Sequence, residues 1–185
     1  MSVAAPGGEL PLVTVVMPAF NAADLLPEAV ESVLAQTYER WQLIIVDDAS
    51  RDHTLAVARE FARRDPRVEV FALPENSGAR PSVPKNHALA RARGELVAFL
   101  DADDVWLPDK LARQVETMRA NPAAVFSYVP YRVIEGREVQ GPVLPRRRRR
   151  YEGPCFESLY LRSVVANSGV VARRDHIGGV PVHEV

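Results

Sequence analysis

The 185-residue sequence predicts an α/β fold, a three-layer sandwich in which helices flank both faces of a mostly parallel β-sheet. Short apolar runs with β-branched residues alternate along the chain with longer segments whose apolar residues recur every three to four positions. The apolar runs are nearly continuous, as is typical of parallel strands that are buried on both faces. With 47% apolar and 25% charged residues, the composition is ordinary for one globular domain.

The candidate strands come in the order 12–17, 42–46, 68–73, 95–100 and 123–129. The segments after the first, second and fourth strands each carry an apolar stripe at helical spacing, which predicts a helix packed on the sheet. Those stripes consist of Leu26, Ala29, Val30, Val33 and Leu34; Leu55, Ala58, Phe61 and Ala62; and Leu111, Val115 and Met118. Residues 135–153 interrupt the pattern with glycines and prolines and predict a loop or a weak hairpin.

Several functional classes are disfavoured by composition. The formal charge of -1 gives no overall attraction to nucleic acid, and the single cysteine, Cys155, lacks a zinc-site spacing with the four histidines. Neither an export signal nor an apolar run of the roughly 20 residues that a membrane span requires is visible. We therefore expect a cytoplasmic protein that can also act peripherally at the inner face of the membrane. Residues 1–11 are expected to form a flexible tail before a domain of residues 12–185.

Two acidic clusters follow candidate strands directly. Asp47 and Asp48 come after the second strand, and Asp101, Asp103 and Asp104 come after the fourth. In an open α/β sheet, ligands bind beyond the carboxyl ends of the strands. We expect these two strand ends to be adjacent, so that their five carboxylates form a hard-oxygen site for Mg²⁺ or Mn²⁺ with a phosphorylated ligand. The alternative is structural, because aspartate is common in turns and helix caps, and we expect that role for Asp104 at the following helix.

The sequence contains neither a Walker-type phosphate loop nor a GxGxxG motif after the first strand. The charge of a diphosphate would then be held largely by the cation, which also stabilises the diphosphate as a leaving group. This favours a nucleotide-diphosphate donor.

Four motifs in order resemble the family 2 glycosyltransferases, which are inverting enzymes of the Rossmann-like GT-A fold. They are VVMPAFNAADLLPEAVESVLAQTY, WQLIIVDDASRDHT, NSGARPSVPKNHALARARGE and FLDADDVWLPDKL, the last of which is similar to the family's DXD motif. The resemblance covers residues 12–179. It implies transfer of a sugar from a nucleotide-diphosphate sugar, with a UDP-sugar expected, to a saccharide or lipid-linked acceptor. It also implies a role in cell wall or polysaccharide biosynthesis.

The resemblance also assigns residues to the donor site. Asp103 is implied as a direct metal ligand and Asp101 as a ligand of the ribose or metal, while Asp48 is implied to accept from the base. Lys85 or Arg80 would supply positive charge near the donor, although PSVPKN departs from the family's usual arginine-bearing segment and Lys85 is equally compatible with a simple helix start. The full set implied for the nucleotide sugar is Pro18, Phe20, Asn21, Asp47, Asp48, Arg80, Lys85, Asp101 and Ala102.

The general base is not evident in the sequence. An inverting transfer needs a carboxylate to take the proton of the acceptor hydroxyl. Glu184 is the only acidic residue after Gly179, and it comes early compared with the family pattern, so we expect the domain to be truncated and the base to lie beyond Val185. Two alternatives therefore stay open: a nucleotide-sugar-binding module that lacks the base, and a phospho-acceptor domain with Asp47 or Asp48 as nucleophile.

The run of five arginines at 146–150 can bind phosphates. A solvated loop is the simpler interpretation of such a run. Contact with an anionic or lipid-linked acceptor is the functional alternative.

Overall fold

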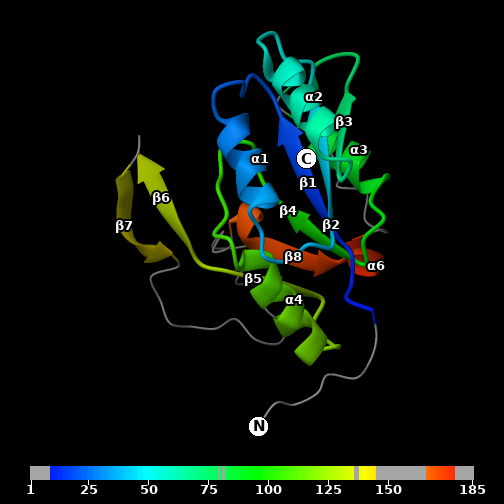
Figure 1. The fold of residues 1–185 in the computed structure, drawn as a ribbon, viewed down its shortest axis with the longest axis vertical. Helices are drawn as coiled ribbons and strands as arrows, with labels where there is room; N and C mark the ends of the chain where they lie inside the picture. Colours follow the sequence, from blue (N-terminus) through cyan, green and yellow to red (C-terminus); the bar gives the residue numbers. More distant parts are fainter. Residues whose placement is uncertain (1–8, 79, 81, 136–137, 145–165, 178–185) are drawn as a thin grey trace.

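The computed structural model describes residues 9–78, 80, 82–135, 138–144 and 166–177. Its main sheet has six strands in the order β3-β2-β1-β4-β8-β5 (Figure 1). Strands β3, β2, β1 and β4 are parallel, whereas β8 runs antiparallel to both β4 and β5. The strands are β1 Val13–Ala19, β2 Trp41–Asp47, β3 Val68–Ala72, β4 Leu96–Phe99, β5 Phe126–Tyr128 and β8 Val170–Arg173. The predicted mostly parallel sheet is confirmed.

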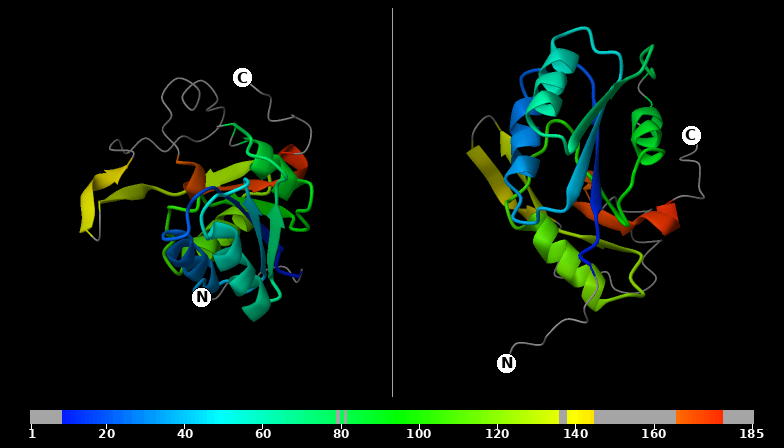
Figure 2. Two further views of the ribbon diagram at one scale, coloured as in Figure 1. Left: turned by 90° about the horizontal axis from the view of Figure 1, so that it is seen from above. Right: turned by 45° about the vertical axis from the view of Figure 1, so that its right-hand side comes forward.

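Helices cover both faces of this sheet. Figure 2 shows α1 (Leu26–Leu34) and α2 (Thr54–Arg64) on one side of the parallel strands and α3 (Ser82–Leu89) on the other. Alternate strand residues divide accordingly, since Val15 packs in the cluster with α1, α2 and α4 (Lys110–Ala120), and Val16 packs in the cluster with α3. Because both faces are buried, the strands need the continuous apolar sequence that predicted them. Within the described residues, the other helices are the short η1 (Asn167–Gly169) and α6 (Arg174–Ile177).

The predicted helical stripes form the core contacts. Leu26, Val30, Phe61, Leu111 and Met118 are all buried in the larger apolar cluster. Residues 54–64 and 110–120 form helices whose boundaries lie close to the stripes.

A separate two-stranded sheet pairs β6 (Tyr131–Glu135) with β7 (Glu138–Leu144) and extends away from the main sheet in Figure 1. The sequence predicted a loop or weak hairpin for residues 135–153, and the hairpin that the structure contains begins earlier. The arginine run at 146–150 lies outside the described residues.

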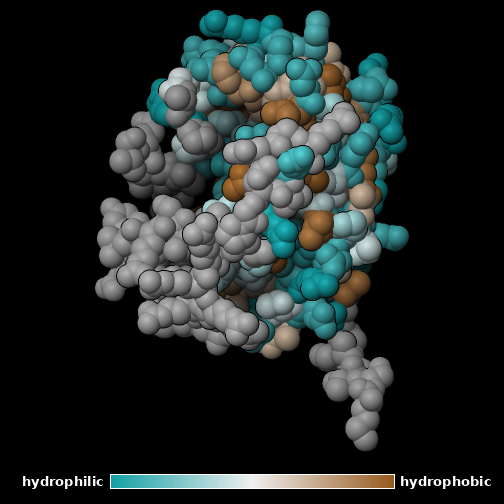
Figure 3. All heavy atoms as spheres, turned by 90° about the vertical axis from the view of Figure 1, so that its left-hand side faces the viewer, coloured by the Kyte–Doolittle hydropathy of each residue, from teal (hydrophilic) through white to brown (hydrophobic). Residues whose placement is uncertain are grey.

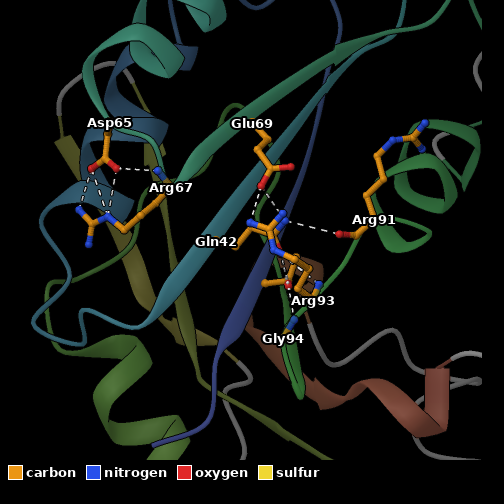
Figure 4. A network of polar contacts seen from close by, with 8 residues as sticks. Gln42, Asp65, Arg67, Glu69, Arg91, Arg93 and Gly94 are labelled. Atoms are coloured by element: carbon orange, nitrogen blue, oxygen red, sulfur yellow. Dashed lines mark hydrogen bonds and ion pairs between the residues drawn. The ribbon is translucent and has the colours of Figure 1, made fainter.

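A polar network joins the amino ends of the parallel strands (Figure 4). Gln42 on β2 is its hub: its Oε1 accepts from Thr14 Oγ1 at 2.9 Å and from the Arg93 backbone N at 3.1 Å, and its Nε2 donates to Glu69 Oε1 at 2.9 Å. Thr14 Oγ1 in turn accepts from the Gly94 backbone N at 2.9 Å. This network ties β1, β2 and β3 to the turn before β4. It lies at the opposite end of the strands from the acidic clusters.

The described surface carries few large apolar side chains. On the face shown in Figure 3, hydrophobic residues are dispersed among hydrophilic ones. Among the described residues, the exposed large apolar side chains are Leu10, Phe20, Leu25, Val105, Leu107, Val125, Tyr131 and Val133.

Candidate active site

The loops that follow β1, β2 and β4 meet at the carboxyl edge of the parallel sheet. The prediction that the ends of β2 and β4 are adjacent was wrong, because β1 lies between these two strands. Strand order depends on long-range pairing, which a local pattern does not encode. The three loops nevertheless share one edge, since β2, β1 and β4 are parallel.

The loop after β1 contains Pro18, Phe20 and Asn21. Phe20 is 46% exposed, while Pro18 is half-buried at the end of the strand. Asn21 adopts a left-handed conformation with φ 48°. Its backbone N donates to Ser50 Oγ at 2.9 Å, and its Oδ1 accepts from the Arg51 backbone N at 2.8 Å. These bonds fasten the first loop to the loop after β2 and leave the Phe20 ring at the surface.

Asp47 and Asp48 are both buried, and they differ in their partners. Asp48 accepts three hydrogen bonds: from the Ser77 backbone N at 2.9 Å, from Ser77 Oγ at 2.6 Å and from Asn76 Nδ2 at 3.2 Å. Asp47 Oδ2 accepts from the Ser50 backbone N at 3.2 Å, whereas its buried Oδ1 has no partner among the described residues. Asp48 thus holds the loop at Asn76–Ser77, and Asp47 keeps unused acceptor capacity.

Arg80 belongs to the same loop as Ser77. Its Nε donates to the Ser77 backbone O at 3.0 Å, which folds the arginine back toward the segment that binds Asp48. Arg80 is exposed, and through Ser77 it belongs to the segment that contacts Asp48.

Asp101 opens the acidic loop, by which we mean Asp101–Asp104 after β4. Lys85 Nζ in α3 lies 3.2 Å from Asp101 Oδ1. From η1, Asn167 Nδ2 lies 3.2 Å from Asp101 Oδ1 and 3.3 Å from Asp101 Oδ2. The sequence left the role of Lys85 open between a donor-site cation and a helix-start residue, and the structure makes it the ionic partner of Asp101. The repulsion within the acidic loop is thus compensated partly from inside the chain.

The other residues of the acidic loop differ sharply in exposure. Ala102 is 7% exposed and packs in the core, whereas Asp103 is exposed and has no hydrogen-bond or ionic partner among the described residues. Asp104 accepts from Ser168 Oγ at 2.5 Å, so its expected role at the next helix was wrong: that helix, α4, begins only at Lys110. Asp104 is exposed as a residue, but partial desolvation of its carboxyl raises its pKa; the Ser168 hydrogen bond opposes that rise, and the neighbouring carboxylates of Asp103 and Asp101 add to it.

A divalent cation fits the acidic loop if one or two carboxylates bind it and water and substrate phosphates supply the other ligands. Among the described residues, no group of three or more Asp, Glu, His or Cys side chains is arranged to hold a metal. Mg²⁺-type cations, however, commonly use one or two carboxylates and take their other oxygens from water and substrate phosphates. The exposed Asp103, with Asp101 two residues before it, matches that donor set. A cage of all five predicted carboxylates does not form.

Three residues near the acidic loop were not predicted from the sequence. Asn167 and Ser168 reach the acidic loop from a segment more than 60 residues away, and no local motif marks them. Lys110 is 5% exposed and places its Nζ 3.6 Å from the centre of the Trp106 ring, with no hydrogen-bond partner among the described residues. Burial holds the pKa of Lys110 well below its ordinary value, although the aromatic ring offsets part of that cost.

A parallel α/β sheet with an acidic loop at its carboxyl edge is the architecture of the GT-A glycosyltransferases, and the sequence comparisons agree. A profile of the family described as "Glycosyl transferase family 2" matches residues 14–175. The chain belongs to this family, as its motifs predicted.

Named relatives carry the same assignment. TuaG of Bacillus subtilis (strain 168), provisionally named a teichuronic acid biosynthesis glycosyltransferase, is 45% identical over 175 residues, which cover 95% of this chain and 67% of TuaG. WfgD of Escherichia coli, named UDP-Glc:alpha-D-GlcNAc-diphosphoundecaprenol beta-1,3-glucosyltransferase, is 34% identical over 140 residues, or 76% of this chain.

A solved structure confirms the fold. The mannosyltransferase PcManGT from Pyrobaculum calidifontis, in complex with GDP-Man and Mn²⁺, superposes with a TM-score of 0.65 at 26% identity over 91% of this chain. The chain spans 53% of WfgD and 47% of PcManGT.

Two further predictions concern the base and the membrane. Glu184, the weak candidate for the general base, lies outside the described residues. In the described ranges, no helix combines the length and apolar character needed to cross a bilayer.

Proposed function

We propose that the chain binds a nucleotide-diphosphate sugar together with Mn²⁺ or Mg²⁺ and, in the whole protein, transfers the sugar to an acceptor hydroxyl with inversion. The observation that carries the proposal is Asp103, an exposed carboxylate without a partner among the described residues, at the end of a buried strand of a family 2 domain. The names of WfgD and PcManGT support the donor class and the metal, since they specify UDP-Glc, GDP-Man and Mn²⁺.

In this proposal, Asp103 binds the cation directly and Asp101 serves the ribose or the cation. The cation would neutralise the diphosphate and stabilise its departure. Asp101 now contacts Lys85, so a ligand that engages Asp101 also changes the surroundings of the lysine ammonium. Lys85 would then provide positive charge beside the donor phosphates, as a single charge rather than the two-pronged fork of arginine.

The base of the nucleotide is proposed to bind near Asp47 and Asp48, with the loops of Phe20 and Arg80 beside it. Asp48 already accepts three hydrogen bonds, and a carboxylate has room for about four. One further donor, such as a ring N–H of the base, completes that capacity. Asp47 Oδ1 is the second candidate acceptor. Because both carboxylates are buried, the loop must shift before either of them binds the base.

The alternative of a phospho-acceptor domain is disfavoured by the same contacts. A nucleophilic aspartate must present a free oxygen to an incoming phosphoryl group. Asp47 is 2% exposed and Asp48 is 7% exposed, and both oxygens of Asp48 are occupied by Asn76 and Ser77.

The acceptor is proposed to be a saccharide or a lipid-linked saccharide, in cell wall or polysaccharide biosynthesis. The name of WfgD includes a diphosphoundecaprenol acceptor, and that of TuaG includes teichuronic acid biosynthesis. A cytoplasmic enzyme with such an acceptor would work at the inner face of the membrane.

A donor-turnover assay tests the proposal against its alternative, a binding module without a base. The 185-residue chain is incubated with UDP-glucose or GDP-mannose, Mn²⁺ and a saccharide acceptor, and released nucleotide and product anomer are followed by NMR. An inverted product, or slow inverting hydrolysis of the donor, is expected of an enzyme. Nucleotide binding without either reaction identifies the incomplete module, and a retained anomeric configuration contradicts the proposed mechanism.

A further inference from the structure

The acidic loop is electrostatically unfavourable by itself. It places three carboxylates within four residues, and like charges at that spacing repel. A cation site also requires its ligands to be held in position before the cation arrives, because a loop that must be ordered on binding loses affinity. Something in the fold must therefore fix the direction in which Asp103 points.

Ser168 bridges the two ends of the acidic loop with one hydroxyl. Its Oγ accepts from the Asp101 backbone N at 3.0 Å and donates to Asp104 Oδ2 at 2.5 Å. The first bond fixes the backbone where the loop leaves β4, and the second fixes the side chain where the loop ends. Asp103 lies between these two points.

Asn167 supports the same loop through its first carboxylate. Its Nδ2 lies within 3.3 Å of both oxygens of Asp101, and Lys85 contacts Oδ1 from α3. The Asp101 carboxylate is therefore held by the Asn167 amide, in η1 directly before β8, and by the Lys85 ammonium in α3.

The segment that carries Asn167 and Ser168 is itself firmly held. The Ser168 backbone O accepts from Trp106 Nε1 at 2.7 Å, and the Gly169 backbone O accepts from Gln114 Nε2 at 3.1 Å. A Cβ on Gly169 would lie 2.9 Å from the Val129 backbone O, so the chain approaches its neighbour here as only glycine allows. The Asn167–Ser168 pair is thus a rigid support for the acidic loop.

We propose that Asn167 and Ser168 are positioning residues of the cation site: they act through Asp101 and Asp104 to orient Asp103 toward the metal. This inference rests on the proposed function. Partners that orient metal ligands in this way typically contribute about 10- to 100-fold to metal affinity.

The test measures Mn²⁺ affinity in two series, one with saturating UDP and one with saturating GDP. The concentration of free Mn²⁺ is measured by electron paramagnetic resonance. We expect Ser168→Ala to weaken Mn²⁺ binding about 10- to 100-fold. Ser168→Thr, which keeps the hydroxyl, should restore most of the affinity. Ser127→Ala is the matched control, because its hydroxyl also bonds beside this segment, to Gln114 Nε2 at 3.1 Å, without contacting the acidic loop.

The outcomes separate the two proposals. If Ser168→Ala binds Mn²⁺ with wild-type affinity, the positioning role is overturned and the proposed function stays intact. If Ser127→Ala loses as much Mn²⁺ affinity as Ser168→Ala, the loss is a general structural effect, and the positioning role is again overturned. Absence of nucleotide-dependent Mn²⁺ binding in the wild type overturns both. If Ser168→Ala does not fold, Asn167→Ala, at a half-buried position, takes its place with the same expected loss, and unchanged affinity in it refutes the inference.

Discussion

Replacing Gln42 with methionine removes the hub of the network in Figure 4 and keeps the length of the side chain. Gln42 is 2% exposed and Thr14 is fully buried, so the Thr14 hydroxyl would lose its acceptor where water cannot replace it. A buried group left without a partner costs about 1–3 kcal/mol, and the bonds to Arg93 and Glu69 add a smaller amount because their surroundings are partly exposed. We expect a total loss of about 2–4 kcal/mol.

For a chain of this size, that loss lowers Tm by about 4–16 °C. The assay is thermal unfolding followed by circular dichroism, with Glu69→Gln as the control. Glu69 pairs with Arg93 at 2.6 Å, but the Arg93 side chain is 61% exposed, so the control should change stability by no more than about 1 kcal/mol. Because the network lies at the amino ends of the strands, nucleotide affinity should stay at the wild-type value. A Tm of Gln42→Met within about 2 °C of the wild type would refute the reasoning.

Two other substitutions test features of the buried structure. Gly94→Ala would place a Cβ 2.6 Å from both the Leu12 backbone O and the Thr14 backbone N, so the backbone itself would have to shift. We expect a loss of about 3 kcal/mol or more in urea unfolding, and a variant as stable as the wild type would contradict this packing. The pKa of Lys110 is lower in the folded state than its ordinary value of about 10.4 in the unfolded chain. At pH values between these two pKa values, the unfolded chain binds one more proton than the folded chain, so the free energy of unfolding rises with pH. Urea unfolding at a series of pH values should show this rise in the wild type and not in Lys110→Met, and equal slopes in both would contradict it.

The sequence predicted the parts of the fold that depend on local pattern. Continuous apolar runs indicated β1, β2 and β4, and helical stripes such as Leu111, Val115 and Met118 marked the buried faces. Strand order could not be predicted from local pattern, because the position of β1 between β2 and β4 depends on pairing between segments that are distant in sequence.

The candidate site was likewise predictable where it depends on local sequence and not where it depends on contacts between distant segments. The acidic residues stood out because carboxylates directly after buried strands are conspicuous. The contacts of these carboxylates were not predicted: Lys85 stood out as a candidate cation but not as the partner of Asp101, and Asn167 and Ser168 reach the acidic loop only through the fold. The chain itself compensates the charge of Asp101 through Lys85 and hydrogen-bonds Asp104 through Ser168, so a bound cation is not the only partner of the acidic loop. Asp103 has no such partner among the described residues.

The central claim is that Asp103 binds a cation that in turn holds a nucleotide diphosphate. The most direct measurement is thermal shift of wild type and Asp103→Ala with UDP, GDP, dTDP and CDP, each with and without Mn²⁺. A nucleotide at about 100 times its Kd stabilises by about 2.7 kcal/mol, which corresponds to a rise in Tm of about 5–11 °C. We expect such a rise with at least one nucleotide in the wild type, dependent on Mn²⁺, and its loss in Asp103→Ala. No rise with any nucleotide, or a metal-dependent rise that Asp103→Ala retains, would contradict the account.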